Sequence, residues 1–190
     1  FFISETASYV YQTRKPQRQK EIVKGTKVHG LGNKNAEFWT QFSSTYFTNY
    51  NFYDDVVDIL DKGFQSPISD NWKGYYRYFL IDSNIVEGQM IYKIDIEPKR
   101  PQDLAFNGTI WIYKSTYALQ KVELTLQQSA NLNFIDNIYI KMDWQPTETS
   151  NYHLRSSLLA FDLAELSEKS VSMNGKIYNE FSEIKLEAPQ

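Results

Sequence analysis

The chain has 190 residues, a length that fits one domain and can bury a hydrophobic core without cross-links. Its formal net charge is only -3, from 20 Lys and Arg against 23 Asp and Glu, so no overall field attracts nucleic acid and we expect none as a partner. The chain has no cysteine, which excludes disulfides, thiolate catalysis and the usual structural zinc sites. No run of about 18 apolar residues is present, so no helix is expected to cross a bilayer.

The N-terminal segment is rich in aromatic and β-branched residues over 2–11, which predicts a strand, with a helix as the competing interpretation. A strongly basic stretch follows over 14–34, and its glycines are expected to break it into short pieces. Because the chain opens at Phe1 without a basic and apolar leader, we expect a mature product or a domain excised from a larger protein. The glycines of the basic stretch are Gly25, Gly30 and Gly32.

Aromatic residues then recur at steps of three and four, which is typical of a helix. Such a helix either fills the core beneath a sheet or presents its rings to a ligand as a lid, and both interpretations stay open. A second short helix is predicted over 54–61, ending near Gly63. The aromatic stripe consists of Trp39, Phe42, Tyr46, Tyr50 and Tyr53.

Beyond Lys73 the chain becomes almost all strand. Short polar connections, such as those around 82–88 and 114–116, predict hairpins, since parallel strands need crossovers of a dozen residues or more. We therefore predict one antiparallel sheet built in sequence order. The predicted strands are 75–81, 89–97, 105–113, 117–127, 134–144, 152–162 and 171–186.

The block from Gln89 to Leu126 shows the alternation of strands most clearly. Ile94 and Ile96 fall on one face of their strand, while Lys93 and Asp95 fall on the other, because successive side chains point to opposite sides. One face of the predicted sheet is therefore buried and the other is wet.

These elements predict an α+β fold that is mostly β. We expect a single domain over 1–190, with one strongly curved antiparallel sheet and helices from the 37–61 region packed on its concave face.

No motif for a known chemistry is present, whether G-x-S-x-G, HExxH or a phosphate loop. His29 and His153 lack a second ligand or a nucleophile at a suitable spacing. The aspartates between 54 and 61 lack EF-hand spacing, so a solvated face is the preferred interpretation over a calcium site. We predict no catalytic residue, no metal site and no cofactor, and we expect that the chain is not an enzyme. Gly108 is predicted to mark a bulge or turn.

Five segments carry a family resemblance: FISET at 2–6, NFYDD at 51–55, SPISDN at 66–71, IEPKRPQDLAFNGTIWI at 96–112 and STYALQKVEL at 115–124. Together they resemble a domain of unknown function of Bacteroidetes-type outer-membrane proteins. That domain typically follows a carboxypeptidase-regulatory-like β-sandwich and precedes an outer-membrane β-barrel. The resemblance implies a place on the periplasmic side of the bacterial outer membrane, with those other domains of the same chain as partners.

The pair GTIWI and STYALQKVEL is also similar to the lipoprotein-carrier group of periplasmic proteins, which fold as a half-barrel meander with a hydrophobic concave face. This similarity implies a lipid, an acyl chain or a hydrophobic peptide as the partner. A glycan- or protein-binding domain with exposed tryptophans, or a scaffold without a ligand, is the alternative. The expected ligand-binding residues are Trp39, Phe42, Tyr46, Ile94, Ile110, Ile112, Val122 and Leu124.

Overall fold

The computed structural model divides the chain into two compact units, residues 1–48 and 49–190, and each unit is considered by itself. This division does not test the prediction of a single domain, which stays a prediction. The structure describes residues 2–14, 17–30, 50–60, 62–126, 135–147, 152–163 and 173–182.

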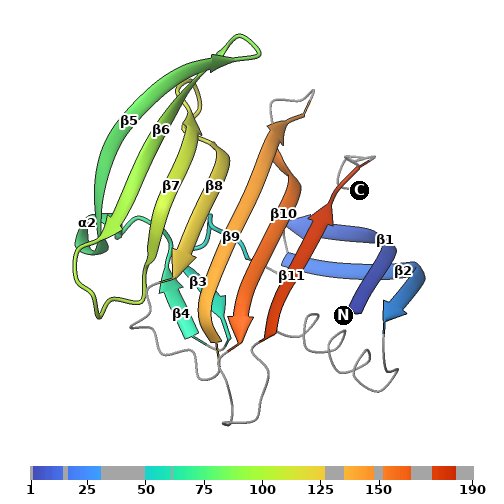
Figure 1. Ribbon diagram of the computed structural model, residues 1–190. Helices are drawn as coiled ribbons and strands as arrows, with labels where there is room; N and C mark the ends of the chain where they lie inside the picture. The colour runs from blue at the N-terminus through green and yellow to red at the C-terminus, as the bar shows by residue number, and fades with distance from the viewer. Residues whose placement is uncertain are drawn as a thin grey trace. The chain divides into compact units, whose positions relative to one another are not determined.

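The described part of the first unit is a long antiparallel hairpin of β1 (Phe2–Arg14) and β2 (Gln17–Gly30) (Figure 1). The strand predicted over 2–11 is confirmed, and the helix is excluded there. The prediction that glycines break the basic stretch is wrong at Gly25, because β2 continues through it. The ladder shifts at this point, opposite Ala7 and Ser8, and a β-bulge accommodates the extra residue without ending the strand.

The second unit is built on one seven-stranded antiparallel sheet whose strands lie in sequence order (Figure 1). All seven predicted strands are present within a few residues of their predicted bounds, except that two of them differ more at one end. The mostly β fold and the antiparallel meander are therefore confirmed. The strands are β5 (Tyr76–Val86), β6 (Gln89–Pro98), β7 (Phe106–Tyr113), β8 (Leu119–Leu126), β9 (Ile135–Pro146), β10 (Tyr152–Leu163) and β11 (Met173–Glu180).

The first of these two differences concerns β5, which is longer than predicted. The polar segment 82–86 pairs with β6 and does not form a loop. The turn is reduced to Glu87 and Gly88, both with positive φ (50° and 77°), as in the two-residue turns that match the twist of a hairpin. The second concerns β11, which ends at Glu180 although its run was predicted to reach 186.

The predicted second helix is wrong. Residues Val56–Ile59 form strand β3, which pairs with β4 (Lys62–Gln65) as a small antiparallel hairpin. Val57 and Ile59 point inward while Val56 and Asp58 are exposed, so the segment follows the period of a strand. β-branched residues and the positive φ of Leu60 (52°) at the turn favour this hairpin over a helix.

The predicted aromatic helix is only partly covered by the described residues. Trp39, Phe42 and Tyr46 lie outside them, whereas Tyr50 and Tyr53 are described and are not helical. The helix in the described part of the chain is α2, the single turn Trp72–Tyr75. Helices packed on the concave face are therefore not supported in that part of the chain.

The β3–β4 hairpin is fixed to the sheet through a buried aromatic cluster. The rings of Phe52 and Phe64 contact the ring of Phe106 in β7, at centroid distances of 5.2 and 5.7 Å. The Tyr76 hydroxyl lies among them, donating to the Gln65 carbonyl (2.5 Å) and accepting from the Phe106 backbone N–H (3.0 Å). One hydroxyl thus connects β4, β5 and β7.

The rest of the core follows from alternation across β6 to β10. Most of the buried side chains lie on one face of the sheet, which ladder partners share, whereas the partners Ile91 and Tyr113 are buried on the other face. The buried side chains of the first face include Ile96, Phe106, Ile110, Val122, Leu124, Ile138, Ile140, Met142, Leu159 and Phe161.

Tyr76→Phe tests the connecting hydroxyl. We expect a loss of about 2 kcal/mol in the free energy of unfolding, because the Phe106 N–H and the Gln65 carbonyl are left buried without this partner. Urea denaturation measures the free energy of unfolding of each variant. Tyr178→Phe, at an exposed tyrosine, is the control and should change little. Equal stabilities for the two variants would contradict the role of the hydroxyl.

Gly108→Ala tests the close approach of β7 to β8 at this glycine. Gly108 has a φ of 142°, and a Cβ there would lie 2.2 Å from the Glu123 carbonyl oxygen of β8. The prediction that Gly108 marks a bulge or turn is wrong, since Gly108 lies inside β7 and its ladder with β8 is regular, but the position does require glycine. We expect a loss of about 3 kcal/mol. Gly74→Ala, with open space around it, is the matched control in the same denaturation experiment.

Candidate functional site

The sheet brings the five predicted ligand-binding residues of β6 to β8 onto one apolar face. Ile94, Ile110 and Val122 are direct neighbours across three strands, and Ile112 and Leu124 lie on the same face. Ile110, Val122 and Leu124 are packed inside the core. Of the five, only Ile94 and Ile112 reach the surface. A ligand on this face can therefore contact only these two side chains unless it displaces the core.

The apolar face continues from these two residues onto the β5–β6 hairpin, where it becomes open to solvent. Leu80 is the ladder partner of Ile94, and Ile85 is the partner of Met90. Leu80, Ile85 and Met90 are 66%, 70% and 38% exposed. We call Leu80, Ile85, Met90, Ile94 and Ile112 the apolar strip. Sequence alternation found Ile94 and Ile112 but missed the three exposed members. Ile85 lies beyond the predicted end of its strand at Ile81, whereas Leu80 and Met90 lie within predicted strands and were not singled out.

A β-bulge explains why the face opens here. The β5–β6 ladder shifts between Leu80 and Asp82, which leaves Ile81 as the extra residue. A bulge increases the local twist and bends the strand that carries it. Figure 1 shows β5 and β6 arching at the end that carries their turn. Along β6 the same face passes from the fully buried Ile96 to the exposed Met90.

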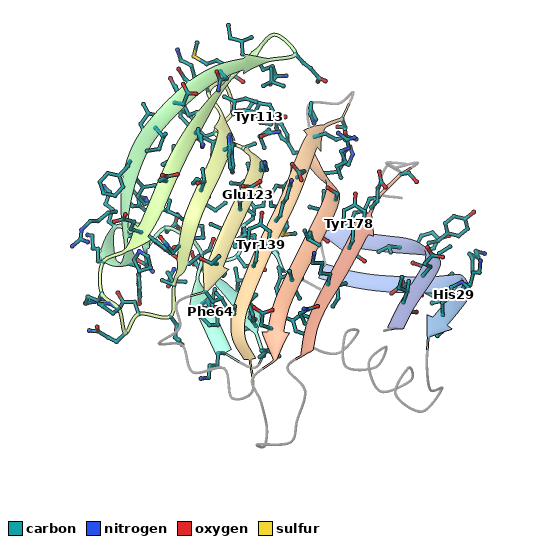
Figure 2. All side chains as sticks on the ribbon, in the orientation of Figure 1. His29, Phe64, Tyr113, Glu123, Tyr139 and Tyr178 are labelled. Carbon is teal, nitrogen blue, oxygen red and sulfur yellow. The ribbon has the colours of Figure 1, made fainter. Side chains whose placement is uncertain are left out.

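The opposite face of the sheet carries charged and aromatic side chains. The ammonium groups of Lys93 and Lys121 lie 5.6 and 4.5 Å from the ring centroid of Trp111. The Glu123 carboxylate lies 2.5 Å from the Lys121 ammonium and 3.7 Å from that of Lys141. Figure 2 labels Glu123 on this face. The Glu123 carboxylate thus pairs with two of these ammonium groups.

The glycan alternative requires tryptophans that are open to a sugar. Trp72 and Trp111 are both half-buried, and ammonium groups already lie over each ring. Trp144 is buried, and Trp39 lies outside the described residues. The described tryptophans therefore offer no free stacking platform.

Burial shifts the pKa of several tyrosines on both faces. It raises the pKa of Tyr53, Tyr76 and Tyr78, and it raises that of Tyr139 with help from the nearby carboxylates of Glu123 and Asp143. These hydroxyls stay neutral, and those of Tyr53, Tyr76 and Tyr78 make hydrogen bonds. The Tyr53 hydroxyl, for example, accepts from the backbone N–H of Leu119 at 3.0 Å.

The two histidines lie apart from the apolar strip. His29 is exposed at the start of the β1–β2 ladder, opposite Ile3. His153 in β10 places its Nε2 2.9 Å from the Gln145 side-chain nitrogen, and burial lowers its pKa. Its Nδ1 is buried without a hydrogen-bond partner in the described part of the chain.

The aspartates predicted as a solvated face have a structural role at one position. The Asp55 carboxylate accepts from the Asp70 backbone N–H at 3.2 Å, which ties the segment before β3 to the loop after β4. Within the described ranges, no group of three His, Asp or Glu side chains gathers as a metal site.

A hollow of about 250 Å³ lies at the other end of the sheet, across β9 to β11. Its lining includes Tyr139, Asp162 and Lys176 and none of the predicted ligand-binding residues. Gly175 forms part of its floor, because a Cβ there would lie 2.2 Å from the Phe161 ring. The mixed polar lining does not suit an acyl chain, so the apolar strip remains the candidate site.

Comparison with known families gives one match, which covers residues 1–184 and is described as a family of unknown function, DUF5686. The resemblance to a domain of unknown function is confirmed, while the Bacteroidetes context and the β-sandwich neighbour stay predictions. Neither the curated proteins nor the solved structures give a match. In the described residues, no helix has the length and apolar character needed to span a membrane.

The lowered pKa of His153 predicts a pH dependence of stability. The unfolded chain takes up a proton near the usual pKa of 6.5, whereas the folded chain resists it, so stability is present above that pH and falls as the pH decreases below it. His153→Gln should reduce this loss between pH 7.5 and 5. The measurement is the urea midpoint at each pH, and identical pH profiles for the two proteins would contradict it.

Proposed function

This chain belongs to the family of unknown function DUF5686, and from that premise we propose that it is a binding module without enzymatic activity. It works on the periplasmic side of the bacterial outer membrane, as part of a larger outer-membrane protein. Its ligand is an acyl chain or a hydrophobic peptide, which lies on the apolar strip. The location rests on the family resemblance of the sequence, and the ligand class rests on the structure of the strip.

The observation that carries the proposal is the exposure of Leu80, Ile85 and Met90 on the same face as the buried core. A contiguous exposed apolar surface in a folded protein typically marks a binding site. A flexible apolar chain along the strip would cover these side chains and touch Ile94 and Ile112 where the core begins. Hydrophobic contact of this kind gains about 25 cal/mol per Å² of buried apolar surface.

An acyl chain suits the strip better than a peptide. An extended peptide gains affinity chiefly by pairing its backbone with a sheet edge. The edge strand β5 is interrupted by the bulge at Ile81, and the Asp82 carboxylate already accepts from the Ser83 backbone N–H at 2.7 Å. An acyl chain needs no such backbone bonds, because its contacts are apolar throughout.

The shifted pKa values in the described part of the chain are consistent with a module that does not catalyse. They belong to tyrosines and to His153, and burial is the largest cause of each shift. Catalytic acids and bases are instead expected as carboxylates or histidines with pKa values moved toward neutrality by a specific partner.

The test is binding of a fluorescent fatty acid below its micelle concentration, combined with native mass spectrometry of the gently purified protein. Leu80→Ser should weaken binding about tenfold, because the Leu80 side chain contributes roughly 1.4 kcal/mol of apolar burial. Phe79→Ser is the matched control, since the neighbouring exposed side chain points to the opposite face.

Three outcomes would contradict the proposal. They are no fatty-acid binding by the wild-type chain, equal loss in the two variants, or tight binding of an apolar peptide that the fatty acid does not displace. A clean apo mass together with no binding in solution would leave the scaffold interpretation in its place.

A further inference from the structure

We propose that the tip of the β5–β6 hairpin docks peripherally into the headgroup region of an uncharged lipid bilayer. The tip exposes apolar side chains on both of its faces. Ile85 and Met90 are partners on the face of the apolar strip, whereas Val86 pairs with Gln89 and points the other way. Val86 is 46% exposed. A ligand bound to one face would bury either Ile85 and Met90 or Val86. An apolar environment that surrounds the tip would bury all three.

A bilayer interface is such an environment. Apolar side chains that enter the boundary between headgroups and acyl chains gain hydrophobic free energy, and the hairpin keeps its backbone hydrogen bonds in its own ladder. The turn Glu87–Gly88 closes that ladder within two residues, and the outer edge of β5, which no other strand covers, stays in contact with water and headgroups when the insertion is shallow. This geometry allows shallow insertion and does not span the membrane.

The neighbouring turn adds an aromatic residue at the same end of the sheet. Tyr117, between β7 and β8, is 74% exposed and has a positive φ of 57°. The Lys114 backbone N–H donates to the Met90 carbonyl at 2.9 Å, which holds this turn against the base of the tip. Tyrosine prefers the membrane interface, because its ring is apolar and its hydroxyl remains in contact with water.

The charges around the tip favour an uncharged surface. Asp82 and Glu87 are balanced by Lys93 and Lys114, and Asp82 is the ladder partner of Lys93. A site for anionic lipids requires a cluster of Lys and Arg, each of which contributes about 1 kcal/mol of attraction. With no net charge at the tip, the affinity should come from apolar contact and should not depend on salt.

The edge strand β5 disfavours the addition of a strand from another chain. Bulges and charged side chains are devices by which edge strands avoid pairing with other sheets. β5 has a bulge at Ile81. It also has the Asp82 side chain, whose carboxylate accepts from the Ser83 N–H and, at 3.0 Å, from the Asn84 side-chain amide.

The inference stands apart from the proposed function, because Val86 is not part of the apolar strip. Fatty-acid binding in solution reports on Leu80, and vesicle docking reports on Val86. Either proposal can therefore fail while the other holds.

The absence of cysteine allows a direct test with the full chain. Val86→Cys, labelled with an environment-sensitive fluorophore, is mixed with phosphatidylcholine vesicles. Val56→Cys is the matched control, because Val56 in β3 is also 46% exposed. We expect a blue shift of the emission at position 86 and none at position 56. In co-sedimentation with the same vesicles, Val86→Asp should reduce binding about tenfold and Val56→Asp should leave it unchanged.

Four results would overturn the inference. The first is no shift at position 86, and the second is an equal shift at both positions. The third is a shift at position 86 that appears without vesicles as the protein concentration rises, which would instead indicate pairing between two copies of the chain. The fourth is binding that is lost in high salt or that requires anionic lipid, because apolar contact alone is not screened by ions.

Discussion

The hydroxyl of Tyr76 is the contact on which the arrangement of the second unit depends. It stands at the first residue of β5 and bonds to the Gln65 carbonyl of β4 and to the Phe106 N–H of β7. Burial raises its pKa, so the group remains a neutral donor and acceptor. Because the cluster of Phe52, Phe64 and Phe106 surrounds this point, the hydroxyl fixes where the β3–β4 hairpin covers the apolar face of the sheet.

The covered core and the candidate site are consequently two ends of a single apolar face. The end near Phe106 is packed against β3 and β4, and the end near Met90 is open. Nothing in the chemistry of the side chains distinguishes Ile96, which is fully buried, from Ile85, which is 70% exposed. The difference arises from the bulge at Ile81, which bends the hairpin, and from the position of the cover.

The sequence is sufficient to predict the strands of the sheet, because the period-2 alternation of β6 to β8 is strong and the connections are short. The sequence pattern predicts the wrong secondary structure where tertiary contacts override local preference. Val57 and Leu60 fit the spacing of a helix, whereas Val57 and Ile59 fit that of a strand, and pairing with β4 decides for the strand. The polar residues 82–84 suggest a loop, yet the ladder between β5 and β6 continues through them. Alternation also places Ile94 and Ile110 on one face, but it cannot tell which of them is covered.

The bulge in β5 also determines what kind of recognition this end of the sheet can perform. It removes regular backbone pairing from the edge, and the Asp82 carboxylate takes up the Ser83 N–H. What remains exposed is side-chain surface that is apolar on both faces of the hairpin. Contact with such a surface has little directional character, so it discriminates by apolar area and by the length of the bound chain more than by sequence. The lipid ligand that we propose fits this constraint better than a particular peptide does, since a peptide strand along this edge would meet the bulge at Ile81.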